Sequence, residues 1–381
     1  MEKVLYFLVF CRKVIRKCNQ ILFNYAQKML AHFWRRKCKL SHDKICVSIK
    51  INGGIGDALM ALPLIEFLVQ KLPKNSIYNY YGLESHYNFI YKDKGIFSYL
   101  GPHDLYSLTT RLDCYDLSIE ISHFPILRQL NLKKFLPHPE ALAIAINLVD
   151  FSNKFSFYTE TFPNSDHQWS RFCIQNKLNR ISGLFYPFNK GKQFTYPVLN
   201  VERLCPGLLE NVGLVGTPYI TVNNGSDSAY NFKQTKSYPL EKWHATIQKL
   251  HNAFPNIKIV QIGHIKTSDP IIGVDVNLLG KTNLTEVAVI LKNALLHIDI
   301  ESGLVHINHA VGGKSIVLFG PTPEKYYGYK ENVNIVSKKC SDCMWLMPTW
   351  QSSCVRGLKD AECMSSISED SIVDACRRIL G

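Results

Sequence analysis

Hydrophobic and polar positions alternate in short blocks along the chain from residue 44 onward. Residues 44–51 have the pattern of a buried strand, and residues 52–57, with three glycines, follow it directly. An apolar helix is predicted next, over residues 58–71. In such a unit of strand, glycine loop and helix, the loop backbone can approach a ligand closely and the helix start offers free N–H groups to an anion.

The pattern is more regular in the second half of the chain. Alternating strands and helices there predict a parallel sheet with helices on both faces, so ligands should gather at the carboxyl ends of the strands. Asn283 and Glu286 have the spacing of a capping box. The predicted strands are residues 219–222, 257–262, 296–300 and 315–319, and the predicted helices are residues 239–254, 284–294 and 304–311.

Polar loops that contain glycine follow these four strands. Because the strands are predicted to be parallel, the loops should meet at one edge of the sheet, where they favour a nucleotide or sugar site. The loops are residues 223–226, 263–264, 301–303 and 320–322.

The composition is that of a folded α/β protein of two-domain size. Of the 381 residues, 46% are hydrophobic and 20% are charged, which argues against intrinsic disorder. No apolar run approaches the ~20 residues of a membrane-spanning helix. We expect an N-terminal arm (1–43), a first domain (44–185), a linker rich in Pro, Gly and Lys (186–218) and a second domain (219–381).

The first 44 residues carry most of the positive charge. Eleven basic and two acidic side chains give them a net charge of +9, out of +13 for the whole chain. Aromatic and aliphatic residues are interleaved with these charges, a pattern typical of an amphipathic helix on an anionic lipid surface. Packing of this arm on the body of the protein, or on a partner helix, is the alternative. No basic stripe occurs elsewhere, so nucleic acid is not expected as a partner.

Neither the N-terminus nor the cysteines indicate export. The apolar run at residues 4–11 is followed at once by Arg12 and Lys13, without the small-residue cleavage pattern of a secretory signal. Seven of the 12 cysteines are scattered over the first 205 residues, which favours reduced thiols. We therefore expect a cytoplasmic protein.

Asp57 is the first candidate for chemistry. A carboxylate beside a helix start is favoured in its ionised form, and it suits a base better than a phosphate ligand. Capping of the helix is the alternative role.

Five motifs in this order resemble the family 9 glycosyltransferases, the ADP-heptose heptosyltransferases of lipopolysaccharide synthesis. They are Gly-x-Gly-Asp at 54–57 with Pro63, Lys-Ser-Tyr-Pro at 236–239 with Trp243, Leu-Gly-Lys-Thr-Asn-Leu at 279–284, Glu-Ser-Gly-Leu-Val-His at 301–306 and Leu-Phe-Gly-Pro-Thr at 318–322. The resemblance covers about residues 44–380. It implies a GT-B architecture with two Rossmann-like domains facing a central cleft, the acceptor on the first and the nucleotide-sugar donor on the second. It also implies inversion at the anomeric carbon without a catalytic metal or other cofactor.

The resemblance assigns roles to individual residues. Asp57 would be the general base for the acceptor hydroxyl. Lys236 would stabilise the leaving diphosphate, with a solvated loop lysine as the alternative. Ser302, Gly303 and His306 would bring a helix N-terminus to the same diphosphate, and a buried structural role is the alternative for His306. The other donor-side candidates are Asn223, Asn224, Gly263 and Glu301, and the acceptor-side loop contains Gly53, Gly54 and Gly56.

Two positions depart from the family pattern. Glu301 stands where the family usually has aspartate, and residues 263–266 replace the acidic residue expected to hold the ribose. The donor sugar or the nucleotide can therefore differ, with ADP-heptose as the first prediction. A catalytically degenerate sugar-nucleotide-binding protein is the alternative from another class, and the intact Asp57 and Lys236 argue against it.

We therefore predict an inverting glycosyltransferase that moves a heptose or related sugar from a nucleotide-diphosphate donor to a lipopolysaccharide or other surface-glycan acceptor. Transfer to a protein, as in the autotransporter heptosyltransferases, is the alternative. The expected location is the inner face of the bacterial cytoplasmic membrane, with peripheral binding through residues 1–43.

The chain ends in a cysteine-rich tail. The spacing of four of its cysteines suits a tetrahedral thiolate site for zinc or iron, which would be structural; disulfides or free thiols are the alternatives. Many family members have a similar tail, and the autotransporter heptosyltransferases bind iron through a cysteine motif. A helix is predicted over residues 368–380, with Cys376 in a packing role. The four cysteines are Cys340, Cys343, Cys354 and Cys363.

Overall fold

The computed structural model describes residues 44–101, 103–111, 113–161, 166–225 and 234–381, together with Met29 and Phe33. The basic arm predicted for residues 1–43 therefore lies outside the described residues, except at those two positions. Within the described ranges, no helix combines the length and the apolar character needed to cross a lipid bilayer.

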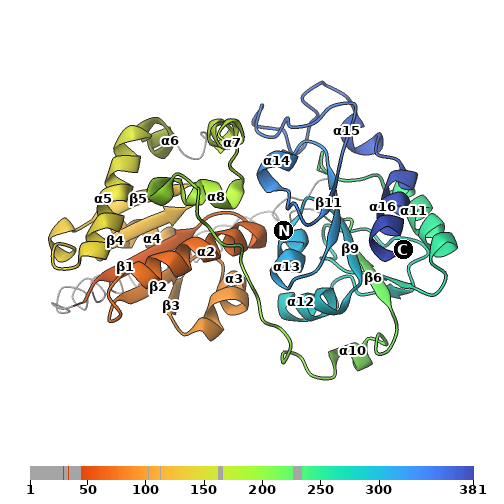
Figure 1. The fold of residues 1–381 in the computed structure, drawn as a ribbon, viewed down its shortest axis with the longest axis horizontal. Helices are drawn as coiled ribbons and strands as arrows, with labels where there is room; N and C mark the ends of the chain where they lie inside the picture. Colours follow the sequence, from red (N-terminus) through yellow and green to blue (C-terminus); the bar gives the residue numbers. More distant parts are fainter. Residues whose placement is uncertain are drawn as a thin grey trace, which may run out of the picture. The chain divides into compact units, whose positions relative to one another are not determined.

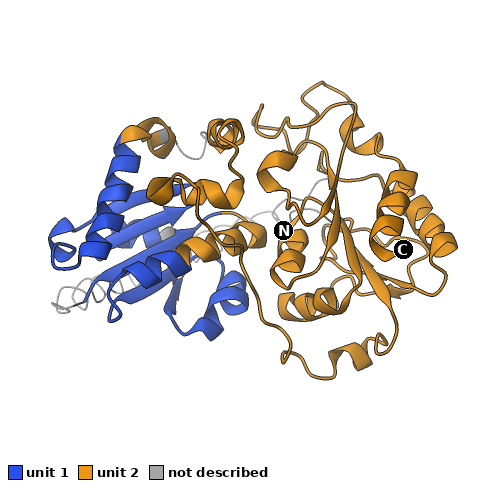
Figure 2. Ribbon diagram, in the orientation of Figure 1, with its two compact units in different colours: residues 1–52, 66–153 blue, residues 53–65, 154–381 orange. Residues whose placement is uncertain are grey.

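The chain forms two compact units, which Figure 2 shows in different colours. Unit 1 consists of residues 1–52 and 66–153, and unit 2 consists of residues 53–65 and 154–381. The glycine loop with Asp57 therefore belongs to unit 2. The domain boundaries expected from the sequence stay a prediction.

A five-stranded sheet lies at the centre of unit 1 (Figure 1). Its order is β3-β2-β1-β4-β5, and neighbouring strands are parallel except for β4 and β5. The inner strands β1 and β4 are almost entirely buried, and their polar side chains pair with each other: Ser48 donates to Ser118, and Lys50 forms an ion pair with Glu120. The strands are β1 (Cys46–Ile51), β2 (Ile77–Tyr81), β3 (Phe97–Gly101), β4 (Leu117–Ile121) and β5 (Pro125–Leu130).

Two long helices accompany this sheet. They are α2 (Ile55–Lys71), whose first turns belong to unit 2, and α5 (Pro139–Lys154). The shorter helical elements are α3 (Glu84–His86), η1 (Tyr87–Tyr91), η2 (Lys92–Lys94), α4 (His103–Arg111) and η3 (Leu132–Lys134).

Unit 2 contains a six-stranded sheet in which every neighbouring pair is parallel. Its order is β11-β10-β9-β6-β7-β8, so the chain first builds outward from β6 to β8 and then returns to place β9 on the other side of β6. This is the strand order of a Rossmann-like sheet, and unit 1 has the same reversal beside β1. The strands are β6 (Tyr219–Val222), β7 (Lys258–Gln261), β8 (Val276–Asn277), β9 (Leu296–Ile300), β10 (Ser315–Phe319) and β11 (Val333–Val336).

The helices of unit 2 include the predicted capping box. The side chain of Asn283 accepts from the N–H of Glu286, and Glu286 accepts from the N–H of Asn283. The helices are α6 (Ser156–Thr161), α7 (Asp166–Gln175), α8 (Arg180–Leu184), α9 (Tyr186–Asn189), α10 (Leu208–Asn211), α11 (Leu240–Ala253), α12 (Leu284–Asn293), α13 (Gly303–Ala310), α14 (Glu324–Tyr327), α15 (Glu362–Ser365) and α16 (Glu369–Leu380).

The core of unit 2 joins the sheet to the two helices α11 and α16. Trp243 and Ile247 of α11 are fully buried, and they belong to the same apolar cluster as Ile372 and Cys376 of α16. The packing role predicted for Cys376 is confirmed.

The fold class and the regular elements of the second half are confirmed. The strands predicted at residues 219–222, 296–300 and 315–319 have the predicted bounds. The edge strands β3 and β5 were not predicted, because half-buried edge strands lack a continuous apolar run.

Candidate functional site

In a Rossmann-like sheet, ligands bind at the carboxyl ends of the strands where the strand order reverses. In unit 2 that position lies between β6 and β9. Asn223 follows β6 directly, and Glu301 and Ser302 follow β9. The fold thus brings two of the four predicted loops to the expected binding edge.

Asp57 lies in the first turn of α2, and both of its carboxylate oxygens accept hydrogen bonds. Oδ2 accepts from the Gly54 N–H at 3.1 Å, and Oδ1 accepts from Arg180 Nη2 at 3.1 Å. The bond to Gly54 ties the carboxylate to the start of its own helix, so the capping role is present. Gly53 has a φ of +98°, and a Cβ there would lie 2.2 Å from Oδ2. The side chain of Asp57 still keeps 27% of its surface exposed, which leaves it open to a ligand.

Arg180, the partner of Asp57, was not predicted from the sequence. It is the first residue of α8, and its side chain is only 2% exposed. A capping box between Asn179 and Ser182 fixes the start of α8 and therefore the point from which Arg180 extends. Burial works against the charge, but Tyr326 and Asp57 favour it, and the pKa of Arg180 lies above its ordinary value.

Two glycines allow the starts of α2 and α13 to come close together. A Cβ on Gly56 would lie 2.5 Å from His306 Cδ2 and 3.5 Å from the Cα of Gly303. A Cβ on Gly303 would lie 2.4 Å from Ile55 Cγ2. The glycine loop and the donor-side helix predicted from the sequence are therefore neighbours within unit 2.

Glu301, Lys236 and His306 form a buried polar group at the end of β9. Lys236 Nζ donates to the Glu301 backbone carbonyl at 3.1 Å and lies 3.8 Å from its carboxylate. His306 Nε2 lies 3.4 Å from the other carboxylate oxygen, and His306 Nδ1 lies 2.8 Å from the Tyr329 hydroxyl. Burial raises the pKa of Glu301, but Lys236 and His306 outweigh it, so the pKa is lowered. Lys236 is 15% exposed and held by these contacts, in contrast to a solvated lysine.

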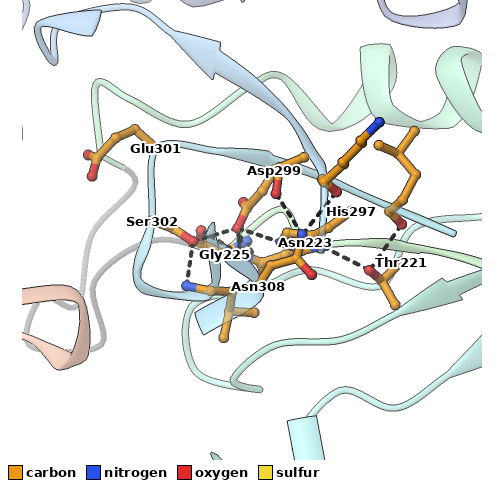
Figure 3. A network of polar contacts seen from close by, with 12 residues as sticks. Thr221, Asn223, Gly225, His297, Asp299, Glu301, Ser302 and Asn308 are labelled. Atoms are coloured by element: carbon orange, nitrogen blue, oxygen red, sulfur yellow. Dashed lines mark hydrogen bonds and ion pairs between the residues drawn. The ribbon is translucent and has the colours of Figure 1, made fainter. Parts of the chain in front are cut away.

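A second buried network, centred on Asp299, supports the loop beneath Glu301 (Figure 3). The Asp299 carboxylate accepts from Asn223 Nδ2 at 2.9 and 3.1 Å, accepts from the Ser302 hydroxyl at 2.5 Å, and lies 3.2 Å from His297 Nε2. Ser302 in turn caps α13, because its Oγ accepts from the Leu304 N–H. Asp299 was not predicted; its position inside an apolar strand was the available signal.

The remaining donor-side candidates are also engaged within unit 2. Asn224 donates to the backbone carbonyl of Asp269 and accepts from Gln261. Gly263 has a φ of +139°, and a Cβ there would lie 2.6 Å from Asn223 Oδ1. These residues shape the loops at the edge of the sheet, and their contact with a donor stays a prediction.

The four tail cysteines lie near one another without forming a metal site. Burial, together with the neighbouring Cys340, Cys343 and Cys354, raises the pKa of Cys363 to about 12. All four are free thiols. In the part of the chain that the structure describes, no group of three or more His, Cys, Asp or Glu side chains is arranged to hold a metal ion. The described geometry therefore does not fit a zinc or iron centre.

A hollow of about 490 Å³ lies elsewhere in unit 2. It is lined by residues from 202–217 with Tyr219, Val289 and Asn293, and none of the predicted site residues is among them. We place the candidate site at Asp57 and the β9 loop, because the chemically suited groups are there.

Part of the chain matches a known protein family. Residues 208–347, which include the end of β9 and the start of α13, match the family model described as glycosyltransferase family 9 (heptosyltransferase). Residues 208–347 of the chain form a glycosyltransferase family 9 domain, as the motifs predicted. No curated protein sequence matches the chain.

Solved structures of this glycosyltransferase family share the GT-B fold of the chain. The ADP-heptose lps heptosyltransferase II of E. coli is 13% identical, with a TM-score of 0.54, over 88% of this chain and 98% of that one. The iron-containing dodecameric glycosyltransferase TibC of enterotoxigenic E. coli is 12% identical, with a TM-score of 0.59, over 88% of this chain and 78% of that one. A family 9 glycosyl transferase of Veillonella parvula is 14% identical, with a TM-score of 0.50, over 88% and 97%.

Proposed function

We propose that this glycosyltransferase inverts the anomeric carbon and moves a heptose or related sugar from a nucleotide-diphosphate donor to a lipopolysaccharide or other surface-glycan acceptor. ADP-heptose is the first candidate donor. The observation that carries the proposal is Asp57, a partly exposed carboxylate in a glycine loop with each oxygen held by one donor. The family 9 domain at residues 208–347 supports the donor class.

The proposed reaction is a single displacement with Asp57 as the base. The acceptor hydroxyl donates to Asp57, its oxygen bonds to the anomeric carbon, the proton passes to the carboxylate, and the bond to the diphosphate breaks. Each carboxylate oxygen can accept two hydrogen bonds. The contacts with Gly54 and Arg180 therefore leave acceptor capacity on both oxygens for the incoming hydroxyl.

Positive charge for the leaving diphosphate is proposed to come from Lys236 and the start of α13. Lys236 is anchored on the backbone carbonyl at the end of β9, two residues before α13 begins. The first N–H groups of a helix and a fixed cation both stabilise negative charge that grows as the bond breaks. Ser302, Gly303 and His306 are proposed to set the position of this helix start.

Glu301 is proposed to contact the sugar. Its side chain points away from the Asp299 network in Figure 3, and Lys236 and His306 favour its ionised form. Asn223, Asn224 and Gly263 are proposed to shape the donor loops, and Gly53, Gly54 and Gly56 the acceptor side.

The tail cysteines and the basic arm have no step in this reaction. Residues 1–43 are proposed to bind the enzyme peripherally to the inner face of the bacterial cytoplasmic membrane.

Nucleotide release from a panel of nucleotide sugars, ADP-heptose included, tests the proposal. Asp57→Asn should keep ADP binding and lower turnover by about 10²–10⁴-fold, because only proton removal is lost. Lys236→Ala should weaken ADP binding and lower turnover together. Adding glycan or polypeptide acceptors then separates the two acceptor classes.

Two results would contradict the proposal. A panel without any nucleotide release would exclude the donor class. Asp57→Asn turnover within about threefold of the wild type would exclude Asp57 as the base.

A further inference from the structure

We propose that Arg180 is a positioning residue that fixes the orientation of the Asp57 carboxylate for proton transfer, an inference that rests on the proposed function. The two residues are 123 positions apart in the sequence, and the fold of unit 2 brings Arg180 Nη2 to 3.1 Å from Asp57 Oδ1.

Arg180 is too deeply buried to bind the substrate itself. The Arg180 side chain is 2% exposed, whereas the Asp57 side chain is 27% exposed. The hollow beside Arg180, lined in part by Met60 and Tyr196, has a volume of about 10 Å³. That volume barely holds one water molecule, so a sugar or a phosphate cannot reach the guanidinium from this side. Arg180 therefore acts on the reaction through Asp57.

The element that carries Arg180 is held from two directions. The capping box of Asn179 and Ser182 sets the first turn of α8. Gly183, on the same short helix, lies against α7 so closely that a Cβ there would be 2.8 Å from Cys173 Sγ. A short helix fixed in this way can present a planar guanidinium in one orientation, which a flexible loop cannot.

The contacts of the carboxylate complete the geometry. Gly54 holds Oδ2 and Arg180 holds Oδ1, so the plane of the carboxylate is defined by two donors on different segments of the chain. A general base must lie within hydrogen-bond reach of the proton it takes, and small errors in its position lower the rate strongly. Without Arg180 the carboxylate keeps the bond to its own loop and can rotate about it.

The charged and titratable groups around the guanidinium come from several elements. Asp166 of α7 is near enough for Arg180 to lower its pKa, although burial raises that pKa to about 7. The charge of Arg180 also lowers the pKa of three other groups, each of which burial raises: Tyr326 and Tyr327 of α14, and Cys173 of α7. Replacement of Arg180 therefore needs a control for general disturbance of this region.

The test uses ADP release from ADP-heptose, with water as the acceptor, and ADP binding measured by calorimetry. Arg180→Gln should lower turnover by about 10–100-fold, with the KM for ADP-heptose and the Kd for ADP within about twofold of the wild type. Arg180→Lys keeps the positive charge but lacks the planar guanidinium, so its turnover should lie between those of Arg180→Gln and the wild type. The matched control is Arg171→Gln, which removes a half-buried guanidinium that donates to the Asp342 carbonyl, and it should stay within about twofold of the wild type.

A double variant decides whether Arg180 acts through Asp57. If it does, Asp57→Asn with Arg180→Gln should be no more than about twofold slower than Asp57→Asn alone. The inference would be overturned if the fold losses in turnover of the two single variants multiplied in the double variant. It would also be overturned if Arg180→Gln had the same turnover as Arg171→Gln. If Arg180→Gln does not fold, a folded Arg180→Lys variant with full turnover would overturn it too. Wild-type protein without ADP release, or a fully active Asp57→Asn variant, would instead contradict the proposed function.

Discussion

At the residue scale, the candidate site depends on the absence of side chains as much as on their presence. Gly56 lies so close to His306 that a Cβ there would be 2.5 Å from the ring, which leaves no space for a methyl group. Gly54, two positions earlier, has nothing within 4 Å of the place where a Cβ would stand. Two glycines of one loop therefore differ in what their substitution should do.

Gly56→Ala should destabilise the protein by about 1–3 kcal/mol and lower turnover, because the new methyl group overlaps the buried His306 ring. His306 cannot move freely, since it contacts Tyr329 and Glu301. Thermal unfolding and ADP release measure the two effects. Gly54→Ala is the matched control, and it should lower the free energy of unfolding by no more than the ~1 kcal/mol typical of a change at a helix cap. Equal stability of the two variants would show that the close approach of α2 and α13 does not exist in solution.

At the element scale, the start of α13 is fixed by a buried carboxylate beneath it. Asp299 is fully buried and accepts from Asn223 and Ser302, and Ser302 caps the helix. A buried charge is costly unless hydrogen bonds replace its water, and here side chains from β6, β9 and the α13 cap provide them. The network ties the cap of α13 to both strands at the binding edge.

Asp299→Asn should lower the free energy of unfolding by about 2–4 kcal/mol and weaken ADP binding. The new amide would place its N–H groups against the Asn223 amide or the Ser302 hydroxyl, where the carboxylate now accepts. Urea unfolding and ADP titration are the measurements. Asp269→Asn, at an exposed side chain, is the control and should change stability by less than about 0.5 kcal/mol. If the Asp299→Asn variant is destabilised but binds ADP as the wild type does, the Asp299 network does not support the donor site.

At the scale of the whole molecule, the charge of the arm is the feature that the sequence predicts and the described residues do not include. The +9 charge of residues 1–44 stands against +4 in the remainder, so any attraction to an anionic surface should reside mainly in that segment.

Deletion of residues 1–40 should release the protein from vesicles that contain phosphatidylglycerol. The attraction is partly electrostatic, so about 1 M salt should imitate the deletion in part, and neutral phosphatidylcholine vesicles serve as the control. Vesicle flotation measures the bound fraction. A truncated protein that still floats with the anionic vesicles would place the membrane contact on the body of the protein.

The fold was largely predictable where strands are buried on both faces. Residues 315–319 are apolar except for Ser315, and residues 296–300 alternate apolar residues with His297 and Asp299; both strands are fully buried, as the inner strands of a parallel sheet are. The elements within residues 72–185 were harder to predict, because the edge strands β3 and β5 are only partly buried and therefore lack a clear apolar pattern.

Local sequence determined the glycine loop, the caps of α12 and α16, and Asp57 as a carboxylate at a helix start, because these depend on residues within one turn of each other. The tertiary structure alone decided that Arg180 holds Asp57 from 123 positions away and that Glu301 lies between Lys236 and His306. It also decided that the tail cysteines, despite a suitable spacing, do not form a metal-binding group among the described residues. Spacing along the chain limits which side chains can meet, but burial and packing of distant segments determine which of them do.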